Sequence, residues 1–291
     1  MFQGSIVALV TPMLSTGELD EENVRQLIEK HIAAGTDAIV LAGTTGEAPT
    51  LTYSEKQRLI RIGVEVAKER IPIIVGTGSY STLDTCYQTE QAMDLGVDAC
   101  LITVPYYNRP TQEGLYQHFR AIAEVAPMPI ILYNHPGRTG CDLLPETVNR
   151  LADISNIIGL KEATGDLARC RELIALCGDR IDLFSGVDDS ALAFILQGGK
   201  GVISITSNVV PKAMHEMCAA ALSGDVGLAG KINTRLMPLH KALSLESNPI
   251  PVKWVLQQMG WIQDGIRLPL TPLSEQYYEA LREAMKISEV I

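Results

Sequence analysis

Short apolar runs alternate with longer amphipathic stretches along most of the chain. The runs are rich in Val, Ile and Leu without polar alternation, which is typical of parallel strands covered on both faces. They predict strands at residues 5–10, 38–42, 71–76, 99–104, 129–134, 156–161, 182–185 and 201–204. After each strand, apolar residues recur at helical spacing. This spacing predicts helices at residues 20–34, 54–69, 82–95, 112–125, 144–152, 167–176, 188–196 and 209–222.

Eight consecutive strand–helix units predict an α/β fold of the (β/α)8 TIM-barrel type. A doubly wound sheet is the rival, but it usually carries a glycine-rich phosphate turn after its first strand. Here that strand ends in Thr-Pro-Met at residues 11–13. After Gly224 the strands stop, and helices are predicted at residues 226–242, 251–259 and 274–287. We therefore expect a catalytic barrel at residues 1–224 and a C-terminal helical domain at residues 225–291, packed on the outside of the barrel or making subunit contacts.

Composition narrows the possible partners. The 291 residues are 46% hydrophobic and carry a formal net charge of −10, which argues against nucleic acid and anionic membranes as partners. The six cysteines form no C-x-x-C pair, so reduced thiols are expected. The N-terminus lacks a basic signal-peptide region, and no apolar run has the length of a membrane span. These features predict a cytoplasmic protein.

One predicted strand, at residues 156–161, ends on a lysine. Strand alternation places Ile157, Gly159 and Lys161 on one face. Burial disfavours a charged amine, so an interior Lys161 would have a lowered pKa and would be a candidate nucleophile. The alternative is a lysine whose stem is buried and whose amine reaches water at the strand end.

The carboxyl ends of the other strands carry further polar groups, and catalytic residues of such barrels lie at this end. The turn 43–47, Gly-Thr-Thr-Gly-Glu, offers amides and hydroxyls to a carboxylate. Tyr133 shares strand parity with Ile131 and is expected inside the barrel, and Arg138 is suited to a second carboxylate. Asp188 and Asp189 are interpreted as a helix N-cap pair, not a metal site. Together with Lys161, this set favours Schiff-base chemistry on a small carboxylated carbonyl compound.

Several motifs resemble the signatures of the 4-hydroxy-tetrahydrodipicolinate synthase family. They lie at residues 43–47, 105–110, 133–139, 159–165 and 248–253, and the likeness runs in register from residue 5 to about residue 272. The resemblance implies a class I aldolase-type lyase of lysine and diaminopimelate biosynthesis. Such an enzyme condenses pyruvate with L-aspartate 4-semialdehyde, needs no metal or organic cofactor, and is typically a homotetramer built as a dimer of dimers.

The resemblance also implies roles for individual residues. Lys161 would form the Schiff base, and Tyr133 would relay protons with Thr44 and with Tyr107 from the neighbouring subunit. The implied substrate-binding positions are Thr45 for the pyruvate carboxylate, Arg138 for the semialdehyde carboxylate, the Ile203 carbonyl and Gly186. Val187 and His135 depart from the commonest family pattern, which usually has a polar and a β-branched residue there.

Two other functions stay open on the sequence. One is a different pyruvate-dependent aldolase, such as an N-acetylneuraminate lyase or a keto-deoxy sugar acid aldolase. Arg138 argues against it, because a site that binds a sugar chain is expected to carry neutral groups that hydrogen-bond to hydroxyls. The other is a non-catalytic small-molecule-binding barrel, which would form no covalent adduct with pyruvate.

The resemblance further implies that free lysine inhibits weakly or not at all. Family members regulated by lysine carry serine, alanine, two histidines, asparagine and glutamate at the effector cleft. This chain has other residues at these positions, in the same order Ala48, Pro49, Tyr53, Lys56, Tyr80 and Asp84. Of the cleft residues compared, only Tyr106 is retained.

Overall fold

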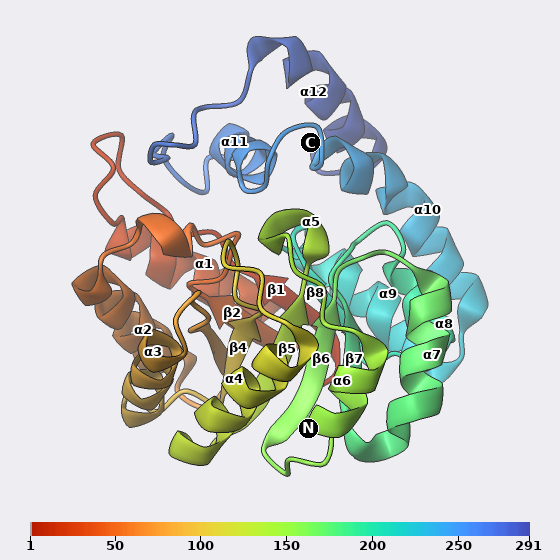
Figure 1. Cartoon of the computed structure of the whole chain (residues 1–291). Helices are drawn as coiled ribbons and strands as arrows, with labels where there is room; N and C mark the ends of the chain where they lie inside the picture. The colour runs from red at the N-terminus through yellow and green to blue at the C-terminus, as the bar shows by residue number, and fades with distance from the viewer. Residues whose placement is uncertain (1) are drawn as a thin grey trace.

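The strands close into a single parallel barrel. The computed structural model describes residues 2–291, and its strands pair in sequence order from β1 to β8, with β8 closing on β1. They span β1 Gly4–Ala8, β2 Ala38–Leu41, β3 Ile73–Gly76, β4 Ala99–Thr103, β5 Ile130–Asn134, β6 Ile157–Glu162, β7 Asp182–Ser185 and β8 Gly201–Ser204. The predicted TIM barrel is confirmed (Figure 1).

Helices surround the barrel between the strands. They are α1 Glu21–Ala34, α2 Tyr53–Ala67, α3 Thr82–Asp94, α4 Gln112–Val125, α5 Pro136–Thr139, α6 Pro145–Leu151, α7 Leu167–Cys177, α8 Ala191–Leu196 and α9 Pro211–Ser223. Single 3₁₀ turns lie at Ala48–Thr50, Gly178–Arg180, Thr206–Asn208 and Glu275–Tyr277. The predicted strands and helices all have counterparts, whose ends differ from the prediction by a few residues. The short helix α5 has no counterpart among the predicted helices.

Side-chain caps explain where several helices begin. The side chains of Asp20, Thr52, Ser81, Thr111 and Asp166 each accept a hydrogen bond from a backbone N–H in the first turn of α1, α2, α3, α4 and α7. Such caps satisfy amides that have no partner within the helix. These helix starts follow the carboxyl ends of the parallel strands and so lie at the end of the barrel where the cavity opens.

Two apolar layers hold the barrel together. Inward-facing side chains fill its interior, namely Ile6, Ala8, Ala38, Val40, Ile74, Ala99, Leu101, Ile131, Tyr133, Ala163, Phe184 and Ile203. The outward-facing strand residues pack against the helices in a larger cluster. Tyr133 therefore points into the barrel, as its parity with Ile131 predicted.

The alternation breaks once, near the start of β6. The pairing between β5 and β6 shifts by one residue, so that neighbouring residues of β5 face Ile157 and then Gly159. Ile158 is the extra residue of this irregularity and packs against the barrel interior, whereas Ile157 belongs to the outer core. The prediction that Ile157 shares a face with Lys161 is therefore wrong, because a β-bulge resets the alternation.

Three helices follow the barrel: α10 Val226–Ala242, α11 Ile250–Gln258 and α12 Tyr278–Ile287. Helix α10 packs against α9 on the outside, as expected for this extension. Helices α11 and α12 lie beyond the carboxyl ends of the strands, on the same side as α5 (Figure 1). The segment before α11 reaches the barrel mouth, where the Asn248 side chain donates to the Thr45 hydroxyl at 2.9 Å. This position over the mouth was not predicted.

Within residues 2–291, no helix combines the length and the apolar character that crossing a membrane requires.

Candidate active site

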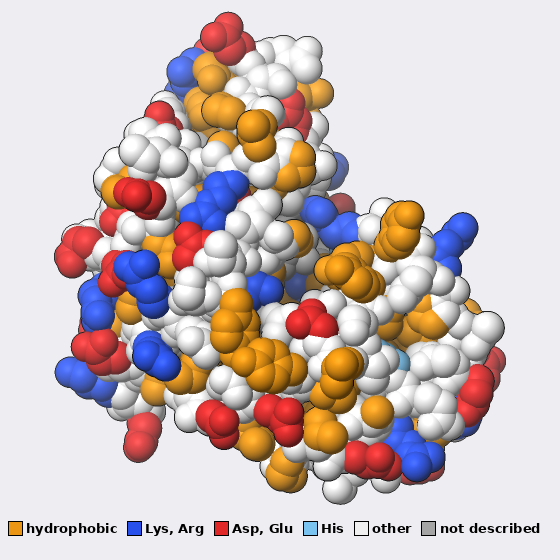
Figure 2. All heavy atoms as spheres, turned by 60° about the vertical axis from the view of Figure 1, so that its left-hand side comes forward, with side chains coloured by type: hydrophobic (Ala, Val, Ile, Leu, Met, Phe, Trp, Pro, Cys, Tyr) orange, Lys and Arg blue, Asp and Glu red, His pale blue; other side chains and the backbone are white. Residues whose placement is uncertain are grey.

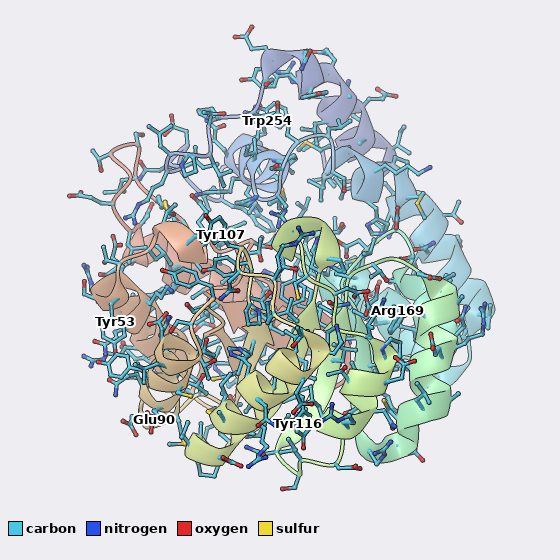
Figure 3. All side chains as sticks on the ribbon, in the orientation of Figure 1. Tyr53, Glu90, Tyr107, Tyr116, Arg169 and Trp254 are labelled. Atoms are coloured by element: carbon cyan, nitrogen blue, oxygen red, sulfur yellow. The ribbon has the colours of Figure 1, made fainter. Side chains whose placement is uncertain are left out.

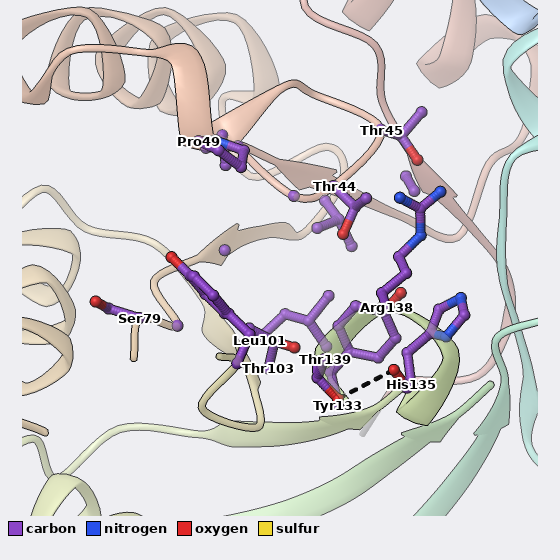
Figure 4. A pocket seen from close by; sticks show the side chains of 18 of the residues that line it. Thr44, Thr45, Pro49, Ser79, Leu101, Thr103, Tyr133, His135, Arg138 and Thr139 are labelled. Atoms are coloured by element: carbon purple, nitrogen blue, oxygen red, sulfur yellow. Dashed lines mark hydrogen bonds between the residues drawn. The ribbon is translucent and has the colours of Figure 1, made fainter. Parts of the chain in front are cut away.

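A cavity of about 510 Å³ opens at the carboxyl ends of the strands. It brings together most of the residues that the sequence predicted for the site, which are Thr44, Thr45, Tyr133, Arg138, Lys161 and Gly186. These residues come from β5, β6 and the segments after β2, β5 and β7, so the closed barrel alone makes them neighbours. In Figure 4, Thr44, Thr45, Tyr133 and Arg138 surround this space.

Lys161 lies near the end of β6 and is only 6% exposed. Its Nζ sits 4.4 Å from the centroid of the Tyr133 ring. Burial lowers the pKa of this amine to about 8, with Asp188 acting in the opposite direction and Arg138 in the same one. Lys161 is therefore a buried amine that reaches the cavity, and not one that escapes to bulk water.

Tyr133, on β5, is 7% exposed. Burial raises the pKa of its phenol, whereas the positive charge of Arg138 and the Thr44 side chain lower it. The phenol is thus protonated near neutral pH and lies among groups that can stabilise a transient phenolate. This combination suits a residue that donates and recovers a proton.

The turn after β2 is fixed by close backbone packing. Gly46 accepts a hydrogen bond from the Thr11 hydroxyl at 2.7 Å. A Cβ on Gly46 would lie 3.1 Å from that hydroxyl oxygen and 3.2 Å from the Leu9 carbonyl oxygen, so the turn leaves little room for a side chain there. Thr45 is 3% exposed, and both Thr44 and Thr45 border the cavity.

Arg138 is carried by the single turn of α5 and is exposed at the rim. Its Nη2 donates to the Asn248 carbonyl oxygen at 3.3 Å. Because the Asn248 amide also bonds to Thr45, this residue connects the guanidinium to the turn after β2. Asn248 was not predicted as a site residue, although it opens the family-like motif at residues 248–253.

Gly186 lies directly beside Lys161. A Cβ there would come within 2.5 Å of the Ala163 Cβ and 3.1 Å of the Lys161 Cε. Only glycine therefore leaves the lysine side chain its present position. Ile203 is buried in the barrel interior below the cavity and does not itself line it.

Tyr107 does not line the cavity of its own chain. It is 91% exposed and has a φ of 74°, a left-handed conformation that non-glycine residues rarely adopt. Figure 3 places it at the barrel rim. An aromatic side chain held outward in this way is available to another molecule.

The structure corrects the interpretation of the Asp188–Asp189 pair. Helix α8 begins only at Ala191, and its cap residue Ser190 makes no side-chain capping bond. The Asp188 carboxylate instead accepts hydrogen bonds from the backbone N–H groups of Ile205 and Thr206 at 3.0 and 3.1 Å. It thus caps the backbone after β8 and places a negative charge near Lys161.

The two departures from the family pattern lie close to the site. His135 lines the cavity, and burial, with Arg138 and Lys161 nearby, lowers its pKa to about 4, so the imidazole is neutral at pH 7. Val187 packs against the apolar interior of the barrel. Among residues 2–291, no three His, Cys, Asp or Glu side chains are grouped so that they could hold a metal ion.

The fold and the site define a class: a TIM-barrel enzyme whose buried lysine can form a Schiff base with a carbonyl substrate. Residues 1–288 match the Dihydrodipicolinate synthetase family, and the chain belongs to this family.

Named relatives agree with this assignment. A 4-hydroxy-tetrahydrodipicolinate synthase of Nitrosococcus oceani is 60% identical and is covered over 100% of both chains. The crystal structure of a chloride-inhibited dihydrodipicolinate synthase of Acinetobacter baumannii complexed with pyruvate is 52% identical, with a TM-score of 0.99 and 100% coverage of both chains. A dihydrodipicolinate synthase of Cyanidioschyzon merolae with lysine bound is 38% identical, with a TM-score of 0.96, and the match covers 100% of this chain and 99% of that one.

Proposed function

We propose that this enzyme condenses pyruvate with L-aspartate 4-semialdehyde to give 4-hydroxy-tetrahydrodipicolinate, in lysine and diaminopimelate biosynthesis. The observation that carries the proposal is Lys161, a cavity-lining amine whose pKa burial lowers to about 8, in contact with the Tyr133 ring. The pyruvate complex of the Acinetobacter baumannii relative supports pyruvate as the first substrate. The six free cysteines support a reducing compartment, and we expect the enzyme to act in the cytoplasm.

The reaction begins on the lysine. The neutral Lys161 amine adds to the ketone carbon of pyruvate, and loss of water gives an iminium. The iminium withdraws electrons, so the methyl carbon loses a proton and becomes an enamine that attacks the aldehyde carbon of the second substrate. The amino group of the semialdehyde then adds to the iminium carbon, which closes the ring and releases the lysine. Tyr133 and Thr44 relay protons through these steps.

The carboxylates are bound on two sides of the lysine. Thr45 holds that of pyruvate, with the Ile203 carbonyl and Gly186 nearby, and Arg138 holds that of the semialdehyde. Their placement around one cavity supports this division, since Arg138 sits at the exposed rim and Thr45 is buried. The enzyme needs no organic cofactor, because the lysine itself supplies the electron sink.

Product analysis tests the proposal against its closest rival. Incubation with pyruvate and L-aspartate 4-semialdehyde should give a compound whose mass equals that of both substrates less one water. Replacing the semialdehyde with N-acetylmannosamine should give no condensation product. The reverse pattern would identify a sugar acid aldolase instead. If neither mixture gave a product, the result would favour a non-catalytic small-molecule-binding barrel.

Replacing Arg138 with alanine should weaken use of the semialdehyde while sparing the pyruvate adduct. A guanidinium–carboxylate hydrogen bond contributes about 1.5–3 kcal/mol, so we expect the KM for the semialdehyde to rise by roughly ten- to 150-fold. Steady-state kinetics with each substrate varied in turn will measure this. Loss of the pyruvate adduct with unchanged semialdehyde affinity would contradict the assignment.

We further propose that the enzyme is a tetramer built as a dimer of dimers, in which Tyr107 enters the relay of the neighbouring subunit. Apolar side chains gather on the face that carries α2 and α3 (Figure 2). Tyr53, Tyr80, Leu83 and Tyr87 are all exposed there, and a second copy would cover them. The outward position of Tyr107 supports a role in trans.

Dilution should therefore lower activity per chain. If Tyr107 is needed from a partner, an isolated monomer lacks one relay group and should be nearly inactive. Activity assays over a dilution series, combined with sedimentation at the same concentrations, will test this. Constant activity per chain in a sample that sediments as a monomer would refute the role of Tyr107.

Free lysine should inhibit weakly or not at all. Several of the replaced cleft residues, namely Ala48, Pro49, Lys56, Tyr80 and Asp84, line the outer part of the same cavity. The Lys56 Nζ donates to the Gln88 Oε1 at 3.1 Å, so its charge is held near the cavity and does not point freely to solvent. An effector lysine would meet this second cation, and the Tyr80 ring adds bulk.

The size of the effect follows from charge repulsion. Two like charges about 4 Å apart repel by roughly 1 kcal/mol in water and about 4 kcal/mol at an effective dielectric constant of 20. This lowers affinity by roughly several-fold to several-hundred-fold. Initial rates at saturating pyruvate with increasing L-lysine will measure it. Strong inhibition at sub-millimolar lysine would show that Tyr106 and Asp84 still form a working effector site.

A further inference from the structure

A buried ion pair connects the C-terminal extension to the turn that borders the cavity. Lys253 of α11 pairs through its Nζ with the Glu47 carboxylate. Lys253 is 5% exposed and Glu47 is 2% exposed. The same Nζ donates to the Thr11 carbonyl oxygen at 3.1 Å. The positive charge of Lys253 is thus compensated by buried partners, the Glu47 carboxylate and the Thr11 carbonyl oxygen.

Glu47 in turn fixes the backbone of the threonine turn. Its own N–H donates to the Thr44 carbonyl oxygen at 3.1 Å, and its second carboxylate oxygen accepts from the Arg267 N–H at 3.2 Å. Glu47 has a φ of 56°, a left-handed conformation that persists only where its surroundings impose it. The ion pair with Lys253 is one of the contacts that impose it.

The turn is therefore held from two elements outside its own strand–helix unit. The segment after β1 contributes Thr11, whose hydroxyl bonds to the Gly46 carbonyl oxygen and whose own carbonyl accepts from Lys253. The C-terminal extension contributes Lys253 and the Asn248 amide, which bonds to the Thr45 hydroxyl. Lys253 itself does not line the cavity.

We infer that Lys253 is a positioning residue for pyruvate: through its ion pair with Glu47 it holds the turn at residues 43–47 so that Thr45 receives the substrate carboxylate. The inference rests on the proposed function, because it assigns the pyruvate carboxylate to this turn. A buried ion pair is weak evidence for stability, since an apolar pair of similar volume often stabilises as well. The charged pair is better explained by a role in positioning, because it fixes Glu47, the last residue of the turn at residues 43–47.

Replacing Lys253 with methionine removes the charged amine and keeps most of the length of the unbranched side chain. A displacement of about 1 Å in a positioning group can cost about 100-fold, so we expect the KM for pyruvate to rise by roughly ten- to 100-fold. The KM for the semialdehyde should stay within about twofold, because Arg138 is carried by α5 and its guanidinium bonds to the Asn248 carbonyl oxygen, not to the ion pair. Lys253→Arg, which keeps the charge, should recover much of the pyruvate affinity. Lys286→Met, the same change at an exposed position of α12, should alter neither KM.

The double variant Glu47→Gln/Lys253→Met separates positioning from stability. Lys253→Met alone leaves a buried carboxylate without its partner, which lowers thermal stability and can prevent folding. The double variant removes both charges, so its melting temperature should return towards that of the wild type while its KM for pyruvate stays raised. If the single variant does not fold, the double variant and Lys253→Arg carry the test.

Two results would overturn the inference. One is an unchanged pyruvate KM in Lys253→Met or in the double variant, which would leave the pair a purely structural role. The other is an equal rise in both KM values, which would indicate a general loss of site geometry. Failure of the proposed function is distinguishable, because then the wild type itself would give no condensation product from pyruvate and L-aspartate 4-semialdehyde.

Discussion

Lys161→Arg should abolish the pyruvate adduct that borohydride reduction traps in the wild type. Arginine keeps a positive charge near Asp188, but its guanidinium does not deprotonate in proteins and cannot form the imine. Loss of a covalent nucleophile lowers turnover by up to about 10⁶-fold in other enzymes. We therefore expect activity to fall to the background rate, with the fold intact by circular dichroism.

The pKa of Lys161 explains why this lysine alone should react. With a pKa of about 8, about one amine in ten is neutral at pH 7, against roughly one in 2,500 for a lysine of pKa about 10.4. Since the neutral fraction rises with pH, adduct formation should accelerate up to about pH 8 and then level off. An unchanged rate between pH 6 and pH 8 would contradict the lowered pKa.

Peptide mass mapping after reduction will locate the adduct. The three-carbon unit should be found on Lys161 and on no other lysine. Lys30→Arg makes the same chemical change at an exposed position of α1 and should leave trapping and turnover unchanged. An adduct on another lysine, or on none, would refute the Schiff-base mechanism.

The barrel could be predicted from the sequence because its signal is local. Each strand is a short β-branched run, each helix has its own period, and eight repeats of the unit leave few topologies. Tyr133 and Lys161 followed from their places at strand ends, since parallel strands of a closed barrel bring these ends together. Which face of the strand such a residue occupies follows from the alternation of side chains along that one strand.

What the sequence did not reveal depends on contacts between distant segments. Asn248 and Lys253 meet the turn after β2 only because the extension folds back over the mouth, and no local pattern encodes that path. The face of Ile157 was misassigned because a bulge depends on the neighbouring strand. The Asp188 carboxylate bonds to a segment 17 and 18 residues further along the chain, so its position before a helix was misleading.

The extension therefore belongs to the active site as much as to the surface of the barrel. Helix α11 supplies a buried cation to the turn at residues 43–47, and the segment before it contacts both Thr45 and Arg138. A barrel truncated after α9 would lose these contacts while keeping Lys161 and Tyr133. Lys161 and Tyr133 come from the barrel, whereas the turn at residues 43–47 is held by contacts from the extension as well.

Tyr133→Phe should lower kcat strongly with little change in stability. Phenylalanine keeps the ring that packs in the barrel interior and lies 4.4 Å below the Lys161 amine, so only the hydroxyl is lost. A positioned proton-transfer group contributes about 10²–10⁴-fold to the rate, and we expect a fall in kcat of this order. Stopped-flow assays of adduct formation and steady-state turnover will measure it, with thermal unfolding as the check on the fold.

A matched tyrosine provides the control for this prediction. The Tyr116 ring on α4 packs under the Arg150 guanidinium, at 3.9 Å from its carbon to the ring centroid, well away from the cavity (Figure 3). Tyr116→Phe keeps that contact and should leave kcat unchanged. If Tyr133→Phe retained kcat within about threefold of the wild type, the phenol would not be the relay, because a group that transfers a proton in the rate-limiting step contributes at least about 100-fold.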